Sequence, residues 1–242
     1  MERAVRRALT LCVLGLWTLA VQAQPAGQPA PARAASGAAQ VDDRWQESLD
    51  AFAAADRARA PQPGGVLFIG SSSIRLWPGL ETQFGTEPVL NRGFGGSRMS
   101  DCARYVEQLV LPYRPRLVIV YAGDNDLAEG RTPREVLASF TAFVKGVRRA
   151  LPDTRITYLS IKPSPLRAAL MPRMVATNTL IAGYSRRTAK LDFIDVYSKM
   201  LDDQGRPRAD LFRPDALHLN AQGYALWRSV IADHLHAPAP PR

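Results

Sequence analysis

The chain has few of the residues that form disulfides or bind metals. It contains two cysteines and three histidines in 242 residues. Cys12 lies in an N-terminal segment that we expect to be removed, so Cys102 is left without a partner for an intramolecular disulfide. His234 and His236 stand beside a proline-rich end, where their i, i+2 spacing is weak evidence for a metal. The composition therefore excludes a cystine framework, and His218 is the histidine to examine for chemistry.

Long apolar runs are also absent outside the N-terminus. A helix needs about 18 apolar residues to cross a bilayer, and no later stretch approaches that length. Within residues 1–23, three arginines precede an apolar run from Ala8 to Val21, and small or apolar residues follow up to Ala23. This pattern predicts a signal peptide over 1–23 and export to the periplasm or beyond the cell, with an uncleaved N-terminal anchor as the alternative. We expect no membrane span in the mature form.

Positive charge is in excess but is not clustered. The formal net charge is +9, and loss of three arginines and one glutamate with residues 1–23 leaves +7. The basic residues adjoin at most in pairs, such as Arg148 with Arg149, and aromatic residues are not interleaved with them. A groove for single-stranded nucleic acid combines such charge with aromatic stacking. We therefore expect a mildly basic, solvated face and no nucleic-acid partner.

Two segments are too poor in large apolar side chains to fold. Residues 24–40 are mostly alanine, proline, glycine and glutamine, and residues 237–242 are almost all alanine and proline. Such segments cannot bury enough surface to offset the entropy lost on ordering. We expect a disordered tether over 24–40, a flexible tail over 237–242 and a single domain over 41–236.

Within that domain, short apolar runs alternate with segments of helical periodicity. Thr132 and Glu135 form a capping-box pattern with proline at the first helical position, which predicts the start of a helix. Strands separated by helices of this length indicate an α/β fold, a five-stranded parallel sheet covered on both faces. The expected strands begin at Val66, Pro88, Leu117, Arg155 and Leu191. The expected helices lie within 41–60, over Cys102 to Leu109 and from Pro133 and Ala221, and residues 178–190 are expected to fall within a further helix.

Three serines follow the first expected strand. Val66 to Ile69 is an apolar run, and Gly70, Ser71, Ser72 and Ser73 come directly after it. In open parallel sheets, ligands bind just beyond the carboxyl ends of the strands. The alternative is a polar turn that caps the next helix, a common use of serine.

A base for such a hydroxyl is available in the sequence Asp215-Ala-Leu-His218. A hydroxyl is a poor nucleophile until a base takes its proton, and the base works best when a third group fixes its tautomer. A tight turn could bring Asp215 against the His218 ring. A capping or salt-bridge role for Asp215 remains the alternative, because aspartate is frequent in turns.

Donors for an oxyanion occur at two further positions. Gly95 and Gly96 would let a backbone amide approach a ligand closely, and Asn125 offers an amide just after Gly123. An ordinary turn and an Asx-turn are the alternatives. Other motifs are excluded: Arg98 stands where a dinucleotide fingerprint needs its third glycine, and no P-loop or Gly-x-Ser-x-Gly sequence is present.

Four segments resemble, in order and approximate separation, the main blocks of the SGNH (GDSL-like) hydrolases. They are Phe68-Ile-Gly-Ser-Ser72, Asn91-Arg-Gly-Phe-Gly-Gly96, Gly123-Asp-Asn125-Asp126 and Asp215-Ala-Leu-His218. The resemblance implies a flavodoxin-like three-layer α/β/α sandwich and a serine esterase site without metal or cofactor.

Carried over block by block, the resemblance makes Ser72 the nucleophile, His218 the base and Asp215 the residue that orients it. The backbone amides of Ser72 and Gly96 and the side chain of Asn125 would form the oxyanion hole. Ser71 stands where the family usually has aspartate, and aligning Gly70 with the family glycine places the nucleophile at Ser72.

These observations predict an exported serine esterase that acts on a small ester or an acylated carbohydrate, with short-chain or O-acetyl groups, through an acyl-enzyme. One alternative is a non-catalytic glycan- or lipid-binding module on the same fold. Another is an acyltransferase with the same triad. The arginines near the site in sequence, Arg75, Arg92 and Arg98, could contact an anionic substrate or simply be solvated. The sequence does not indicate an oligomeric state.

Overall fold

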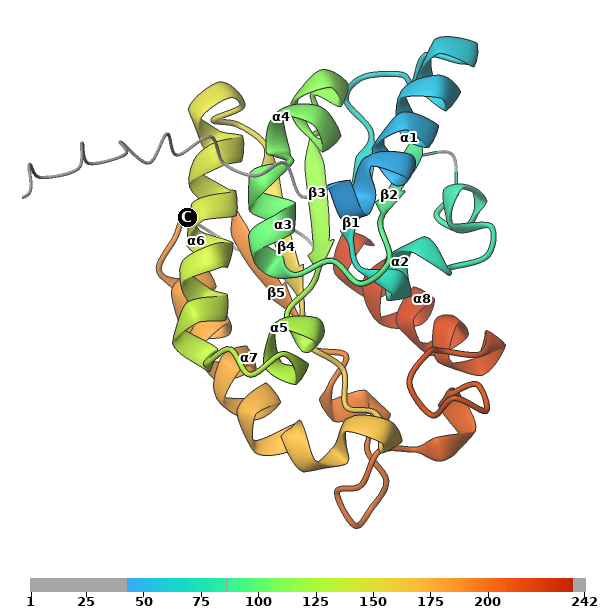
Figure 1. The fold of residues 1–242 in the computed structure, drawn as a ribbon, viewed down its shortest axis with the longest axis vertical. Coiled ribbons are helices and arrows are strands. Elements are labelled where there is room, and N and C mark those ends of the chain that lie inside the picture. Colours follow the sequence, from blue (N-terminus) through green and yellow to red (C-terminus); the bar gives the residue numbers. More distant parts are fainter. Residues whose placement is uncertain (1–42, 86, 237–242) are drawn as a thin grey trace, which may run out of the picture. The chain divides into compact units, whose positions relative to one another are not determined.

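Five short strands form a single parallel sheet in the order β2-β1-β3-β4-β5, which confirms the predicted α/β fold (Figure 1). The computed structural model describes residues 43–85 and 87–236, so the predicted signal peptide, tether and tail lie outside the described residues. The strands are β1 (Val66–Gly70), β2 (Val89–Gly93), β3 (Leu117–Tyr121), β4 (Arg155–Leu159) and β5 (Leu191–Ile194).

Burial explains why these runs form central strands. All five residues of β1 and of β3 are buried, as expected for strands of a parallel sheet that is covered on both faces. In register, Gly70 at the end of β1 lies between Gly93 of β2 and Tyr121 of β3. The carboxyl ends of the three strands therefore meet at one edge of the sheet.

Helices cover the two faces of the sheet and complete a three-layer sandwich. The α-helices are α1 (Gln46–Ala58), α2 (Ser72–Arg75), α3 (Met99–Arg104), α4 (Val106–Leu109), α5 (Asp124–Ala128), α6 (Pro133–Ala150), α7 (Met171–Arg186) and α8 (Ala221–His236). The short 3-10 turns are η1 (Asp43–Trp45), η2 (Leu80–Thr82), η3 (Leu111–Tyr113), η4 (Pro165–Leu170), η5 (Ser198–Met200) and η6 (Ala209–Leu211).

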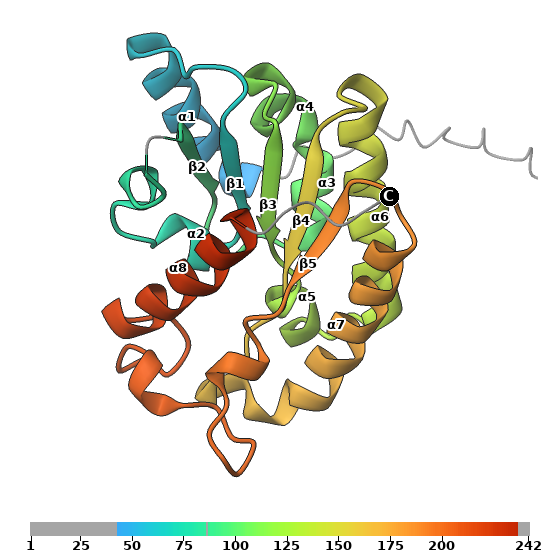
Figure 2. The ribbon, with the colours of Figure 1, turned by 180° about the vertical axis from the view of Figure 1, so that it is seen from behind.

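Alternate side chains of each strand enter different cores. Leu67 and Val118 pack with α3, α4, α6 and α7 on the face seen in Figure 1. Phe68 and Ile119 pack on the other face with α2 and with Trp227 of α8. Figure 2 shows helix α8 in front of the sheet. The period of two along a strand thus supplies both cores from the same apolar runs.

The predicted capping box forms at the start of α6. The Thr132 hydroxyl accepts from the Glu135 N–H at 3.3 Å, and the Glu135 carboxylate accepts from the Thr132 N–H at 2.7 Å. Asn220 likewise caps α8, because its Oδ1 accepts from the Gly223 N–H at 3.0 Å.

Among the described residues, no helix combines the length and apolarity that a membrane crossing requires.

Two helix predictions need correction. The single helix expected from Cys102 to Leu109 is divided into α3 and α4, since Tyr105 has φ −97° and ψ 18°. The helix predicted to include residues 178–190 starts at Met171 and ends at Arg186, so residues 187–190 lie outside it. Lys190 has φ +55°, a left-handed conformation that cannot continue a right-handed helix. Apolar spacing identified the buried face but could not locate these ends.

Candidate active site

The polar side chains singled out in the sequence gather beyond β1 and β3. The strand order 2-1-3-4-5 is that of a flavodoxin-like sheet, whose ligand site lies at the switch point between β1 and β3. Gly70 allows the close approach there: it has φ +148°, and a Cβ on it would lie 1.9 Å from the Tyr121 carbonyl oxygen. Ser72 begins the helix after β1, and Asn125 lies in the helix after β3.

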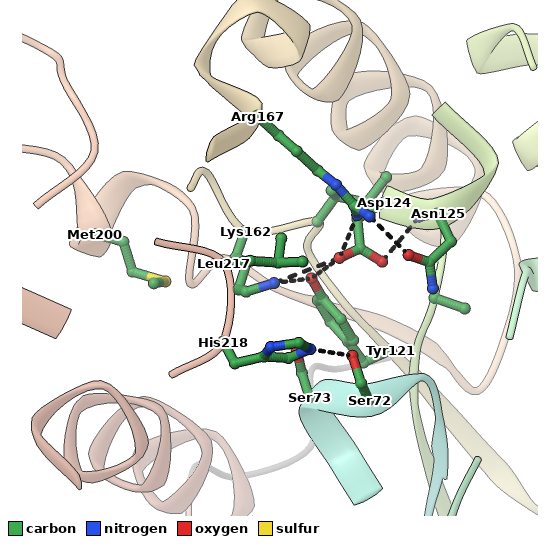
Figure 3. A network of polar contacts seen from close by, with 12 residues as sticks. Ser72, Ser73, Tyr121, Asp124, Asn125, Lys162, Arg167, Met200, Leu217 and His218 are labelled. Atoms are coloured by element: carbon green, nitrogen blue, oxygen red, sulfur yellow. Dashed lines mark hydrogen bonds and ion pairs between the residues drawn. The ribbon is translucent and has the colours of Figure 1, made fainter. Parts of the chain in front are cut away.

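The structure distinguishes the three neighbouring hydroxyls. Ser71 and Ser73 are 0% and 1% exposed, and their hydroxyls have no hydrogen-bond partner within the described part of the chain. Ser72 is only partly buried. Its Oγ lies 3.0 Å from Nε2 of His218, as Figure 3 shows. Of the three hydroxyls, the Ser72 hydroxyl is therefore the one placed against a base.

A tight turn brings Asp215 to His218. Oδ1 of Asp215 accepts from the backbone N–H groups of Leu217 (3.0 Å) and His218 (2.9 Å), and Oδ2 lies 2.7 Å from His218 Nδ1. Backbone hydrogen bonding from His218, followed by the imidazole contact, lowers the pKa of Asp215 far below its usual value. The carboxylate therefore stays ionised at neutral pH. The carboxylate contacts Nδ1 of His218, the ring nitrogen that does not face Ser72.

Three groups are the predicted donors to an oxyanion. The Ser72 N–H is the first of α2, and the first N–H groups of a helix have no intrahelical acceptor. Gly96 has φ +76° with open space where a Cβ would be. Asn125 follows Gly123, whose φ of +123° turns the chain from β3 into α5. Nδ2 of Asn125 donates to the Ser97 carbonyl at 3.1 Å, so the amide of the third sequence block lies next to the residue that follows the second block.

A buried charge cluster beside Asn125 was missed by the sequence analysis, which gave Asp124 no role. Oδ2 of Asp124 lies 3.4 Å from Lys162 Nζ and 3.2 Å from Arg167 Nη1, and it accepts from the Tyr121 hydroxyl at 3.2 Å. Burial alone would raise the pKa of Asp124, but the cations of Lys162 and Arg167 outweigh it and lower that pKa. Lys162 comes shortly after β4, so its position at a strand end was the available signal.

The three arginines near the site in sequence have different surroundings. Arg92 is 5% exposed, forms an ion pair with Asp56 and donates to the Tyr113 hydroxyl at 2.8 Å, so it is neither solvated nor available to a substrate. Arg98 pairs with Asp101. Arg75 is exposed, and its side chain lies over Gly95. The expectation of a substrate contact or a solvated role is therefore wrong for Arg92.

The donor set does not suggest a metal centre. Over residues 43–85 and 87–236, no group of three or more histidine, cysteine, aspartate or glutamate side chains could hold a metal ion. Cys102 is a free, fully buried thiol whose pKa is raised far above its usual value, chiefly by burial. It is therefore a core side chain.

Asp126 should make the stability of the protein depend on pH. Its Oδ2 accepts from the Met99 N–H at 2.9 Å, and burial raises its pKa from 3.8 to about 6. The folded state thus holds this proton more tightly than the unfolded state. The resulting stabilisation is complete below pH 3.8 and is lost as pH rises through about 6.

We expect Asp126→Asn to remove this dependence. Above pH 7 the variant should be more stable than wild type by up to about 3 kcal/mol, and below pH 4 the two should converge. Urea unfolding from pH 4 to 8 measures the difference, with the exposed Asp203→Asn as the control for loss of one carboxylate. A difference that grows toward acid pH would contradict the prediction.

The fold, with its polar site at the switch point of the parallel sheet, is that of the SGNH hydrolases. The sequence matches the GDSL-like lipase/acylhydrolase family over residues 67–226, and the chain belongs to this family. Family membership supports a hydrolase activity. A comparison with curated protein sequences gives no match.

Solved structures resemble the chain over most of its length. A Streptococcus pneumonia protein provisionally described as a platelet activating factor is 22% identical, with TM-score 0.72, covering 80% of this chain and 94% of that protein. A GDSL-like lipase from Bacteroides thetaiotaomicron is 20% identical, with TM-score 0.65 and coverages of 77% and 96%. A carbohydrate esterase family 3 protein from Talaromyces cellulolyticus is 20% identical, with TM-score 0.56 and coverages of 71% and 96%. These likenesses establish the fold.

Proposed function

We propose that the protein is an exported serine esterase that hydrolyses carboxylic esters with a short acyl group through an acyl-enzyme at Ser72. The observation that carries the proposal is the line of contacts from Ser72 Oγ to His218 Nε2 (3.0 Å) and from His218 Nδ1 to Asp215 Oδ2 (2.7 Å). In such a line the imidazole takes the hydroxyl proton while the carboxylate holds its tautomer. Export rests on the arginines and the apolar run within residues 1–23.

The first half of the proposed reaction forms the acyl-enzyme. Oγ of Ser72 attacks the ester carbonyl carbon as Nε2 of His218 takes the hydroxyl proton. The carbonyl oxygen becomes an oxyanion, which accepts from the N–H groups of Ser72 and Gly96 and from Nδ2 of Asn125. The C–O bond to the alcohol then breaks, and the alcohol leaves with the proton that His218 held.

Water completes the reaction along the same path. His218 takes a proton from water as the water oxygen attacks the acyl carbon, and the same donors hold the second oxyanion. The bond to Ser72 Oγ then breaks, and Oγ recovers the proton from His218. The products are a carboxylic acid and the free enzyme, and no group other than water enters.

The polar character of the candidate site supports a short acyl group. The site lies among the side chains of Asn125, Arg167 and His218, which are polar. O-acetyl groups on a glycan suit such a site and an exported protein, and a carbohydrate esterase is among the proteins that share the fold.

Acyl-chain preference tests the proposal. We expect release of acetate from acetylated polysaccharide and from p-nitrophenyl acetate, with kcat/KM falling by 10-fold or more (roughly 1.4 kcal/mol) for long-chain esters. Preference for the long chains would refute the short-acyl proposal. Failure of a serine-directed phosphonate to label Ser72 would instead favour a binding module, and ester products with added alcohols would indicate an acyltransferase.

A further inference from the structure

We propose that Arg167 is a positioning residue that fixes the side-chain amide of Asn125 in the orientation that donates to the oxyanion. The inference rests on the proposed function, because it assigns Arg167 to the oxyanion hole of that reaction. Arg167 lies in η4, and Figure 3 shows its guanidinium reaching both Asp124 and Asn125. The sequence analysis identified Asn125 but not Arg167.

The Asn125 amide is held at both of its ends. Nη2 of Arg167 donates to Oδ1 of Asn125 at 3.0 Å, and Nδ2 of Asn125 donates to the Ser97 carbonyl at 3.1 Å. An amide nitrogen carries two hydrogens, so one remains for a ligand after the bond to Ser97. A flipped amide would place Nδ2 against the guanidinium, donor against donor. The guanidinium therefore decides which amide atom can face the oxyanion.

Arg167 is in turn fixed by Asp124. Nη1 of Arg167 lies 3.2 Å from Oδ2 of Asp124, whose Oδ1 accepts from the backbone N–H of Asn125 at 3.0 Å. Asp124 thus holds the main chain of Asn125, and Arg167 holds its side chain. The planar guanidinium can thus donate to Asn125 while it forms an ion pair with Asp124, whereas an ammonium is a single point charge.

The segment that carries Arg167 also holds the loop of the proposed base. The backbone N–H of Leu166 donates to the Ala216 carbonyl at 3.0 Å, and Ala216 lies between Asp215 and His218 with φ +55°. Neighbouring residues of η4 therefore contact the acid–base loop and the oxyanion donor. The same segment thus contacts both the proposed base loop and the proposed oxyanion donor, as expected for a positioning role.

A double-mutant cycle tests the proposal. We expect Arg167→Gln to lower kcat on p-nitrophenyl acetate by about 10- to 100-fold with KM changed by less than about 2-fold, because the lost interaction matters in the transition state. Asn125→Ala should cost about 10²- to 10³-fold. In the Asn125→Ala background, Arg167→Gln should then have almost no further effect. Losses that multiply, or an Arg167→Gln enzyme equal to wild type, would overturn the proposal.

Two further variants separate orientation from charge and from folding. Arg167→Lys keeps the charge but not the planar guanidinium that donates to Asn125, so its kcat should stay near that of Arg167→Gln, and a wild-type kcat would refute positioning. Arg173→Gln is the matched control. Arg173 lies in α7 and donates to backbone carbonyls of Leu127 and Gly130, so its loss should change kcat by less than about 3-fold.

A measurement independent of turnover keeps the two proposals distinct. In a ¹⁵N spectrum, the side-chain amide of Asn125 is the signal absent from Asn125→Ala, and Arg167→Gln should shift it and speed its hydrogen exchange. If wild type cleaves no ester, the proposed function fails while this spectrum still tests the contact. An unchanged amide signal in Arg167→Gln overturns the positioning role even if the esterase activity is present.

Discussion

Ser72→Ala and His218→Ala are each expected to lower kcat for p-nitrophenyl acetate by at least about 10³-fold, because nucleophile and base act as a unit. The physical reason is the 3.0 Å contact between Ser72 Oγ and His218 Nε2. Without the hydroxyl no acyl-enzyme forms, and without the imidazole the hydroxyl keeps its proton. Steady-state kinetics on variants shown to be folded by circular dichroism measure the effect.

Ser71→Ala is the matched control for the neighbouring hydroxyl. Ser71 occupies the position of the usual family aspartate, yet its Oγ is buried and has no hydrogen-bond partner within residues 43–85 and 87–236. Its removal should therefore leave kcat within about 3-fold of wild type. The assignment of Ser72 fails if Ser72→Ala keeps wild-type activity, or if Ser71→Ala is the variant that loses it.

Asp215→Asn is expected to lower kcat by about 10³- to 10⁴-fold while leaving the fold intact. Oδ1 of Asp215 accepts two backbone N–H groups, and Oδ2 faces His218 Nδ1. In the variant, the amide oxygen takes the place of Oδ1, so the amide nitrogen must donate to Nδ1. The imidazole proton then moves to Nε2. This nitrogen faces Ser72 and, once protonated, cannot accept the hydroxyl proton.

Asp210→Asn serves as the control for that variant. Asp210 is an exposed carboxylate in η6 that pairs with Arg208, so its loss should change kcat by less than about 3-fold. A ¹⁵N spectrum of the imidazole would report the tautomer directly. Wild-type kinetics in Asp215→Asn would remove Asp215 from the mechanism and return it to the capping role that aspartate often has in turns.

Local patterns were enough for the parts of the site that form within a few residues. Asp215 and His218 are three residues apart, and one tight turn joins them. Thr132 and Glu135 have the same separation, and their capping box forms as the sequence predicts. Each of these contacts depends on short chain geometry, which the residue types and spacing already specify.

Contacts between distant segments could not be predicted from local patterns. Arg92 is close to the site in sequence, but in β2 its side chain turns into the contact with Asp56 and Tyr113. Arg167 lies 42 residues from Asn125 and still donates to it. Lys162 lies 38 residues from Asp124. Neither cation belongs to a sequence motif, so its partner could be identified only after β3 and β4 had paired.

The sequence by itself determined where the strands lie, that β1 and β3 are buried, and which polar residues follow them. Those features depend on hydrophobic period and on turn residues, which act over a few positions. Only the tertiary structure decided that β1 lies between β2 and β3, that Arg92 pairs with Asp56, and that Arg167 donates to Asn125. Strand pairing and packing join segments far apart along the chain. Such long-range contacts do not produce a periodic pattern in the sequence, so they cannot be predicted from it.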